Sequence, residues 1–142
     1  MIFNFFWKKM NESADLIKDY STNPVNNFDM SDADIVYEEW NIVCGDQIKI
    51  FIKLDADKIQ KFSFTWNTAT VSTASASIIA EQIEWKNLDE VLARNYEYMH
   101  NLWLEVSTRR KRAVVLPLVA IINWIYSYRG LEKKVDFDDL LE

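Results

Sequence analysis

Two stretches in the middle of the chain alternate between apolar and polar residues with a period of two. They cover residues 47–54 and 59–66, and their alternating apolar positions are Ile48, Ile50, Ile52, Leu54, Phe62, Phe64 and Trp66. A period of two places such side chains on one face of a strand. Because only the polar segment Asp55-Ala56-Asp57-Lys58 separates the two stretches, the pattern predicts an antiparallel hairpin with one apolar face.

The segments before this hairpin predict one helix, one loop and one extended segment. Apolar residues recur with a helical period over residues 8–20, with charged residues on the other side, and predict a helix. Residues 21–34 include Pro24, which stops a helix, and several turn-forming residues, so they are expected to form a loop. Residues 35–43 are expected to be extended.

The segments after the hairpin are helical in pattern. The first predicted helix covers residues 69–85, and its first half consists of small residues that permit close backbone packing. The second is predicted to open at Asn87, where Glu90 lies at the spacing of a capping box, and to keep its helical period to residue 106.

A third helix is predicted with Pro117 in its first turn and its end at Arg129, before Gly130. Its residues leave little polar surface, which favours deep burial over the alternative of a subunit contact. Residues 131–142 form an acidic tail with room for a short amphipathic helix. Strands followed by helices predict an α+β fold: one domain over residues 1–142, with an antiparallel sheet of about three strands and helices packed on one face.

Composition excludes several classes of protein. The 142 residues are 49% apolar with 2 Gly and 2 Pro, which excludes a disordered or linker-rich chain. The net charge of −6 argues against binding to nucleic acid or to an anionic membrane. A single cysteine excludes a disulfide within the chain and agrees with the reducing cytoplasm, where we expect the protein to be. The single histidine, His100, argues against a self-contained zinc enzyme or a Ser-His-Asp hydrolase.

Residues 1–9 are apolar and aromatic and then basic. The apolar run is too short to span a membrane, and its lysines follow it, whereas a signal peptide has them first. We expect an apolar N-terminal extension that packs on the domain; the alternative is a surface patch for a partner.

The candidate chemistry begins at Cys44-Gly45-Asp46, at a predicted corner between strands where Gly45 can adopt turn angles. A thiol and a carboxylate two positions apart can share a soft or borderline metal ion, or the thiol can act as a nucleophile. An inert buried cysteine is the alternative.

Four motifs follow one another along the chain: Asn23-Pro24-Val25-Asn26, Cys44-Gly45-Asp46, Ala74-Ser75-Ala76-Ser77 and a basic turn before Leu116. This order, over about residues 10–128, resembles the U-type iron–sulfur cluster assembly scaffolds, the family of IscU, SufU and the N-terminal domain of NifU. In that family three cysteines and an aspartate bind zinc or a nascent cluster, and a cysteine receives sulfur from a cysteine desulfurase.

The resemblance assigns only part of the family's metal site to this chain. Cys44 and Asp46 correspond to the first cysteine and the aspartate, whereas Ala69 and Ala113 occupy the other two cysteine positions and Arg112 stands in place of a histidine. His100 could contribute only if its helix turned it toward Cys44. Two chains could also pool their ligands across a symmetric interface. We expect no zinc or iron–sulfur cluster in the isolated monomer, because a closed tetrahedral site needs four ligands.

The run Arg109-Arg110-Lys111-Arg112 is the only concentrated positive charge in an acidic chain. A solvated turn between helices is one interpretation. The other interpretations are a docking point for an acidic partner, or a charge that lowers the pKa of the Cys44 thiol.

The resemblance implies an iron–sulfur cluster assembly protein that is not an enzyme and has a degenerate metal site, scaffold-like or sulfur-acceptor-like through Cys44 and Asp46. The alternative is an interaction module that binds no metal and docks on a cysteine desulfurase or self-associates. Under both hypotheses the expected partner is a cysteine desulfurase, with a homo-oligomer as a further option and with neither nucleic acid nor membrane.

Overall fold

Three antiparallel strands form the sheet in the computed structural model of this protein, which describes the backbone of residues 2–65, 69–102 and 104–141 and the side chains from residue 11 onward. The strands are β1 (Ile35–Asn41), β2 (Asp46–Asp55) and β3 (Lys58–Thr65), in the order β1-β2-β3. Ile50 of the central strand lies between Tyr37 and Phe64. The predicted hairpin is therefore confirmed, although Trp66 lies outside the described residues.

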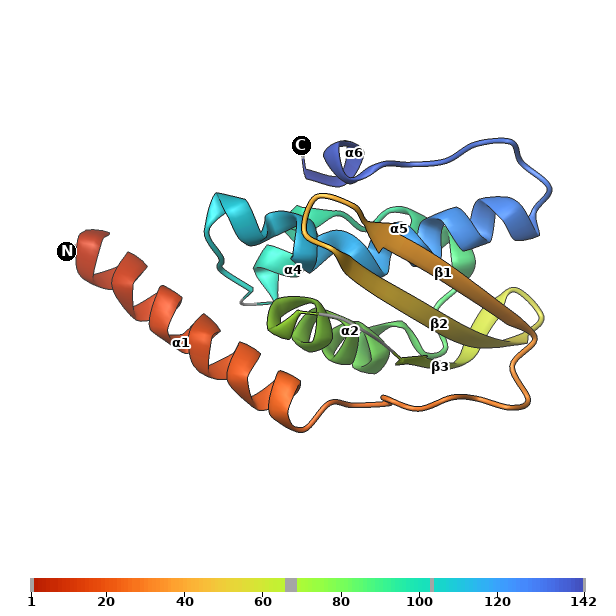
Figure 1. Cartoon of the computed structure of the whole chain (residues 1–142), viewed down its shortest axis with the longest axis horizontal. Coiled ribbons are helices and arrows are strands. Elements are labelled where there is room, and N and C mark those ends of the chain that lie inside the picture. The colour runs from red at the N-terminus through yellow and green to blue at the C-terminus, as the bar shows by residue number, and fades with distance from the viewer. Residues whose placement is uncertain (1, 66–68, 103, 142) are drawn as a thin grey trace.

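Helices cover one face of this sheet. In chain order they are α1 (Ile2–Thr22), α2 (Thr70–Ile83), α3 (Leu88–Leu92), α4 (Tyr96–Asn101), the 3-10 turn η1 (Thr108–Arg110), α5 (Lys111–Tyr128) and α6 (Phe137–Leu141). Figure 1 shows α2 and α5 behind the sheet, with α1 toward one end of the molecule. The predicted α+β fold with helices on one sheet face is confirmed.

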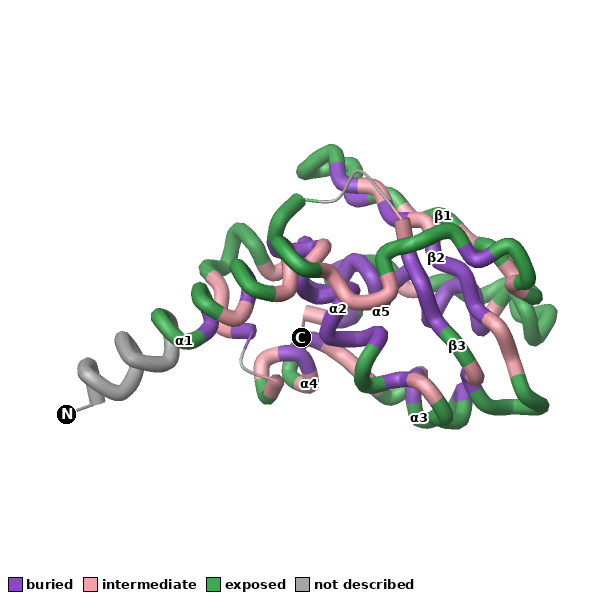
Figure 2. The backbone as a smooth tube through the Cα atoms, turned by 90° about the horizontal axis from the view of Figure 1, so that it is seen from below, coloured by how far each residue is buried: buried purple, intermediate pink, exposed green. Residues whose placement is uncertain are grey.

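The core lies between the sheet and α5. The apolar face of the hairpin is fully covered, since Ile48, Phe62 and Phe64 expose none of their surface. All residues of α5 from Ala113 to Ile125 are buried, and Figure 2 shows buried chain gathered where α2, α5 and the strands meet. Burial of the third predicted helix is confirmed. Residues at this depth supply most of the hydrophobic stabilisation of a domain of this size.

The small residues of α2 allow it to pack closely against α5. Ala74, Ser75 and Ala76 are fully buried, and the Ser75 hydroxyl donates a hydrogen bond to the backbone carbonyl of Val114 in α5. A side chain any longer than serine would hold the two backbones apart.

The predicted loop between α1 and β1 is confirmed, and it is fastened to β3. Asn26 has a φ of 55°, which asparagine tolerates better than most residues. Its side-chain amide donates to the carbonyl of Phe62 over 2.8 Å, and its own carbonyl accepts from the N–H of Phe64 over 3.0 Å. The loop thus pairs with the free edge of the sheet.

The first helix is longer than predicted. It begins at Ile2, so most of the apolar segment 1–9 continues the helix instead of forming an extension before it. Whether the aromatic side chains of this segment pack on the domain lies outside the described side chains. At the other end of the helix, a hydrogen bond to the carboxylate of Glu81 in α2, together with burial, raises the pKa of Tyr20.

The prediction of one helix from Asn87 to residue 106 was wrong. The capping box is present, with Glu90 accepting from the N–H of Asn87 over 3.3 Å. However, α3 ends at Leu92, and Asn95 starts a second helix, because its side-chain oxygen caps α4 by accepting from the N–H of Tyr98 over 3.1 Å. Asparagine favours such caps over helix interiors. The helical period of the apolar residues continued across this break and concealed it.

The prediction that Pro117 lies in the first turn of the third helix was also wrong. The helix α5 begins at Lys111, so the basic run forms η1 and the first turn, and Pro117 lies inside the helix. Proline has no N–H and can donate no hydrogen bond to the carbonyl of Ala113 four residues earlier. The predicted end of the helix is confirmed, since α5 stops at Tyr128 with Arg129 as its cap and Gly130 at a φ of 71°.

The acidic tail contains the short amphipathic helix that the sequence predicted, α6, with Phe137 and Leu140 buried. Asp136 and Asp139 cap its start by accepting each other's backbone N–H. Upstream, the buried side chain of Asn123 in α5 exchanges two hydrogen bonds with the backbone of Val135, over 2.7 and 3.0 Å. Among the described residues, no helix is long and apolar enough to cross a membrane.

Candidate functional site around Cys44

Cys44 lies in the tight turn that joins β1 to β2. The carbonyl of Asn41 accepts hydrogen bonds from the N–H groups of Cys44, over 3.2 Å, and of Gly45, over 2.8 Å. Gly45 has a φ of 74°, a left-handed conformation that favours glycine. The Cys44 thiol is free and exposed at this turn, so the alternative of an inert buried cysteine does not hold.

Asp46, the first residue of β2, is turned inward and only 5% exposed. One carboxylate oxygen accepts from the N–H of Ala69 over 2.8 Å, and the other accepts from the hydroxyl of Ser72 over 3.0 Å. Ala69 is the N-cap residue of α2 and has no oxygen in its own side chain to perform this role. Asp46 therefore caps α2 from another element and places its negative charge at the positive end of the helix.

The four positions that the sequence grouped together line one cavity of about 380 Å³. Cys44 reaches it from the β1–β2 turn, Asp46 from the start of β2, Ala69 from the N-cap of α2 and Ala113 from the first turn of α5. The remaining lining residues are Thr70, Val71, Arg109 and Arg110. We call this hollow the Cys44 cavity.

The side chains of the Cys44 cavity do not fit a tetrahedral zinc ion or a cluster held by one chain. The side chains of Ala69 and Ala113 have no atom that can bind a metal ion. Both carboxylate oxygens of Asp46 already accept hydrogen bonds at the start of α2. Within the side chains that the structure describes, no three of the metal-binding types His, Cys, Asp and Glu come together. Two arginines at the cavity also disfavour a cation there.

His100 does not turn toward Cys44. It lies in α4, its Nε2 contacts a carboxylate oxygen of Glu105, and it lines a different cavity together with Tyr96 and Lys111. Burial and the nearby Glu105 carboxylate raise the pKa of Tyr96. The Lys111 ammonium lies 4.9 Å from the centre of the Tyr96 ring. The idea that His100 completes the set of ligands is therefore wrong for this chain.

Arg112 connects the Cys44 turn to the tail. Its Nε donates to the side-chain oxygen of Asn41 over 3.5 Å, its Nη1 lies 3.3 Å from a carboxylate oxygen of Asp138, and its guanidinium lies 4.6 Å from the ring centre of Phe137. Asn41 is fully buried, and its amide nitrogen has no hydrogen-bond partner among the described residues. Sequence reasoning missed both Asn41 and the tail, because their contacts to Arg112 span 71 and 26 residues.

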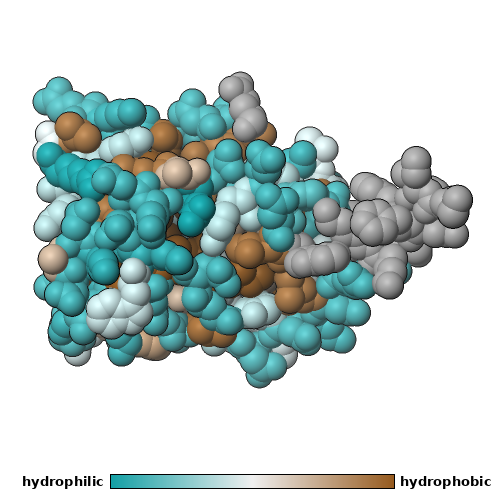
Figure 3. All heavy atoms as spheres, turned by 180° about the vertical axis from the view of Figure 1, so that it is seen from behind, coloured by the Kyte–Doolittle hydropathy of each residue, from teal (hydrophilic) through white to brown (hydrophobic). Residues whose placement is uncertain are grey.

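Three exposed apolar side chains surround the same turn. Trp40 at the end of β1 is 55% exposed, and Ile42 and Val43 inside the turn are 91% and 73% exposed. Large apolar residues exposed together are typical of surfaces that contact other proteins. Seen from behind the view of Figure 1, the molecule has a mainly hydrophilic surface with apolar side chains gathered toward its middle (Figure 3).

Comparison with known proteins identifies relatives of this chain and of its fold. The model of the NifU-like N-terminal domain family matches residues 12–135. The iron–sulfur cluster assembly scaffold protein IscU of Streptococcus pyogenes serotype M1 is 33% identical over 78 residues, which are 55% of this chain and 48% of that protein. The zinc-dependent sulfurtransferase SufU of Bacillus subtilis (strain 168) is 33% identical over 78 residues, 55% of this chain and 52% of that protein. The chain thus spans about half the length of the curated relatives it matches.

Solved structures share the fold. A candidate iron–sulfur cluster assembly scaffold protein for the SUF system (FiSufU) from Fervidobacterium islandicum AW-1 superimposes with a TM-score of 0.62 at 26% identity, covering 75% of this chain and 90% of that one. A NifU-like protein (N-terminal) from Brucella abortus gives a TM-score of 0.70 at 16% identity, covering 81% and 92%, and shows the fold alone.

Proposed function

Because the chain belongs to the family of NifU-like N-terminal domains, we propose that it acts in iron–sulfur cluster assembly and that it accepts sulfur on Cys44. In this role it is a carrier and not an enzyme that turns over a small substrate. It works beside a cysteine desulfurase, in a reducing compartment such as the cytoplasm, where an exposed thiol stays free. The scaffold and sulfurtransferase activities in the names of its relatives guide this proposal.

The observation that carries the proposal is the environment of the thiol. Cys44 is exposed, lies in a tight turn with Gly45 and lines a cavity together with Arg109 and Arg110. The thiolate is the form of cysteine that attacks sulfur, and a thiol exposed at a cavity is accessible to a sulfur donor. The same cavity lacks the donors for a metal ion, so sulfur chemistry fits this site better than metal storage.

Sulfur transfer from a donor persulfide needs no oxidant or reductant. The Cys44 thiolate attacks the outer sulfur of the persulfide on the donor cysteine, the donor's S–S bond breaks, and the donor cysteine leaves as a thiolate. The new S–S bond makes Cys44 a persulfide, and the proton of the outer sulfur moves with it. The step is an exchange at one sulfur atom and conserves electrons.

The exposed apolar residues at the turn favour a second candidate function. Trp40, Ile42 and Val43 give the chain a surface with which to dock on a cysteine desulfurase or on a second copy of itself. In this alternative the chain regulates or stabilises its partner, and Cys44 takes no part.

A transfer experiment separates the two functions. The full chain is incubated with the cysteine desulfurase of the same cell and with cysteine, and its intact mass is measured without reductant. We expect a gain of one sulfur atom, about 32 Da, on Cys44 and none in the Cys44→Ser variant. Stable binding of the desulfurase with no sulfur on Cys44 would instead establish the docking function.

A further inference from the structure

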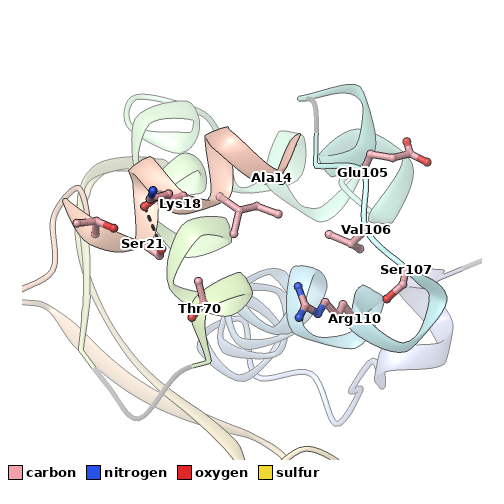
Figure 4. A pocket seen from close by; sticks show the side chains of 10 residues that line it. Ala14, Lys18, Ser21, Thr70, Glu105, Val106, Ser107 and Arg110 are labelled. Atoms are coloured by element: carbon pink, nitrogen blue, oxygen red, sulfur yellow. Dashed lines mark hydrogen bonds between the residues drawn. The ribbon is translucent and has the colours of Figure 1, made fainter. Parts of the chain in front are cut away.

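A second cavity, of about 560 Å³, lies directly beside the Cys44 cavity. It is bounded by the C-terminal half of α1, the first residue of α2 and the segment from Glu105 to Arg110. Figure 4 shows Arg110 extending toward Thr70, with Ala14 and Lys18 of α1 on the far side of the hollow. We call it the Lys18 cavity.

The two cavities adjoin each other, and we call the pair of them the groove. Thr70 and Arg110 belong to the lining of both, one from the start of α2 and the other from η1. Lys18 lies on one side of this shared pair and Cys44 on the other, so a ligand that occupied both cavities would cross Thr70 and Arg110.

The lining of the groove has an excess of positive charge, with three cations against two carboxylates, within an acidic protein. Its cations are Lys18, Arg109 and Arg110, and none of the three has an ion-pair partner among the side chains that the structure describes. Both carboxylates in its lining have partners: Asp46 accepts hydrogen bonds at the start of α2, and Glu105 contacts His100. The whole chain carries −6, so an anionic ligand is attracted to this groove and repelled by most of the remaining surface.

The rest of the lining suits an extended polypeptide. Apolar side chains of Ala14, Ile17 and Val106 lie between hydroxyl groups, which belong to Ser21, Thr22, Thr70 and Ser107. An extended segment points its side chains alternately to two sides, and its backbone groups need hydrogen-bond partners such as these hydroxyls. A small inorganic anion would use the cations and leave the apolar part without a partner.

We propose that this groove binds an acidic, extended segment of the protein that delivers sulfur to Cys44, with carboxylates near Lys18 and Arg110 and the sulfur-bearing cysteine at the Cys44 cavity. This inference rests on the proposed function and adds the chemistry by which the donor is recognised. Binding through the carboxylates places the donor sulfur beside the thiol that attacks it.

The probe is a pair of synthetic peptides that differ only in charge. Each carries one cysteine activated as a neutral 2-thiopyridyl disulfide; one has aspartate and glutamate on alternate positions before the cysteine, and the other has asparagine and glutamine there. Release of thiopyridone measures disulfide formation with Cys44 in the full chain. At low salt we expect the acidic peptide to react at least about fivefold faster, because a charged groove raises the local concentration of its counter-ion.

The variants locate the effect. The double variant Lys18→Gln/Arg110→Gln should react with the two peptides at nearly equal rates, and 0.5 M salt, on the order of a 4 Å screening length, should do the same to the unmodified chain. Lys86→Gln is the matched control: it removes a positive charge beyond the far end of α2, on the order of 20 Å away, and should keep the preference. Reaction with neutral dithiodipyridine checks that the thiol itself is unchanged.

Equal rates for the two peptides on the unmodified chain would overturn this inference, as would a preference that the double variant retains. The desulfurase experiment separates it from the proposed function. If the peptide preference holds and Cys44 never receives sulfur, the binding of acidic segments to the groove is supported and the sulfur-acceptor function is wrong. If the double variant receives sulfur at the unmodified rate, the function stands and the groove inference is wrong.

Discussion

The hydroxyl oxygen of Ser77 in α2 accepts a hydrogen bond from the backbone N–H of Val25, over 3.2 Å. The same oxygen lies 3.2 Å from the carbonyl oxygen of Tyr20 and 3.0 Å from that of Thr73, and these two carbonyls are the acceptors for its one proton. One side chain thus joins α2, the end of α1 and the loop that follows it. Val25 and Ser77 are 52 residues apart in the sequence, and their contact connects the segment Asn23–Asn26 to the segment Ala74–Ser77.

We predict that Ser77→Ala lowers the free energy of unfolding by about 1 to 2 kcal/mol, because it leaves the half-buried N–H of Val25 without its acceptor. Urea denaturation followed by circular dichroism measures the change. Ser127→Ala, at an exposed position of α5, should change stability by less than about 0.5 kcal/mol. Equal effects of the two substitutions would contradict this role of Ser77.

Asp46 should be a structural residue as well as part of the site. Asp46→Ala removes the acceptor of both the Ala69 N–H and the Ser72 hydroxyl. We expect this substitution to lower the free energy of unfolding by about 2 kcal/mol. Asp46→Asn keeps one of the two acceptor oxygens and should lower the free energy of unfolding by roughly half as much. Asp29→Ala, at an exposed loop position, is the control. If Asp46→Ala were as stable as the unmodified chain in the same urea titration, the capping role would be wrong.

Chelation should leave the stability of the isolated chain unchanged. The family resemblance assigns Ala69 and Ala113 to two of the three cysteine positions, and a bound metal would supply folding energy only if its ligands were present. We predict a thermal midpoint that moves by less than about 1 °C when EDTA is added. A midpoint that falls, together with one equivalent of zinc released from the protein, would show that a second chain or another residue completes the site.

The tail should depend more on the packing of Arg112 than on its ion pair. Arg112→Ala removes the contact with the buried Phe137 ring as well as the contacts with Asp138 and Asn41. Amide hydrogen exchange in residues 137–141 should then be about fivefold faster, since local opening becomes easier by about 1 kcal/mol. Asp138→Asn should change exchange little, because the side chain of Asp138 is 81% exposed. The reverse order of effects would count against this account.

Short-range patterns predicted the elements whose partners are near in sequence. The alternation around Ile50 and Phe62 gave the hairpin, and the Asn87–Glu90 pair gave the start of α3. Patterns of the same kind failed at Asn95, because apolar periodicity continues through the break that this cap produces. They also gave the wrong start for α5, which begins at Lys111 and contains Pro117 in its interior. A proline inside a buried helix is tolerated when tertiary packing outweighs one lost hydrogen bond.

The site was predicted only as far as the family resemblance reached. Resemblance grouped Cys44, Asp46, Ala69 and Ala113, which line one cavity in the structure. It could not predict that Asp46 caps α2, since the groups that Asp46 binds lie 23 and 26 residues away. It also gave no sign that Lys18 lies beside the cavity, because the position of α1 depends on tertiary contacts with α2 and with the segment after α4.

The burial of α5 has a consequence for synthesis on the ribosome. The sheet is complete at Thr65, but α5, which packs against β1 and β2, ends at Tyr128. At translation rates of about 5 to 20 residues per second, the interval between them lasts on the order of 3 to 12 s. During that time the nascent chain carries Ile48, Ile50 and Phe62 on a sheet face without its main cover, the kind of surface that chaperones for extended apolar segments recognise.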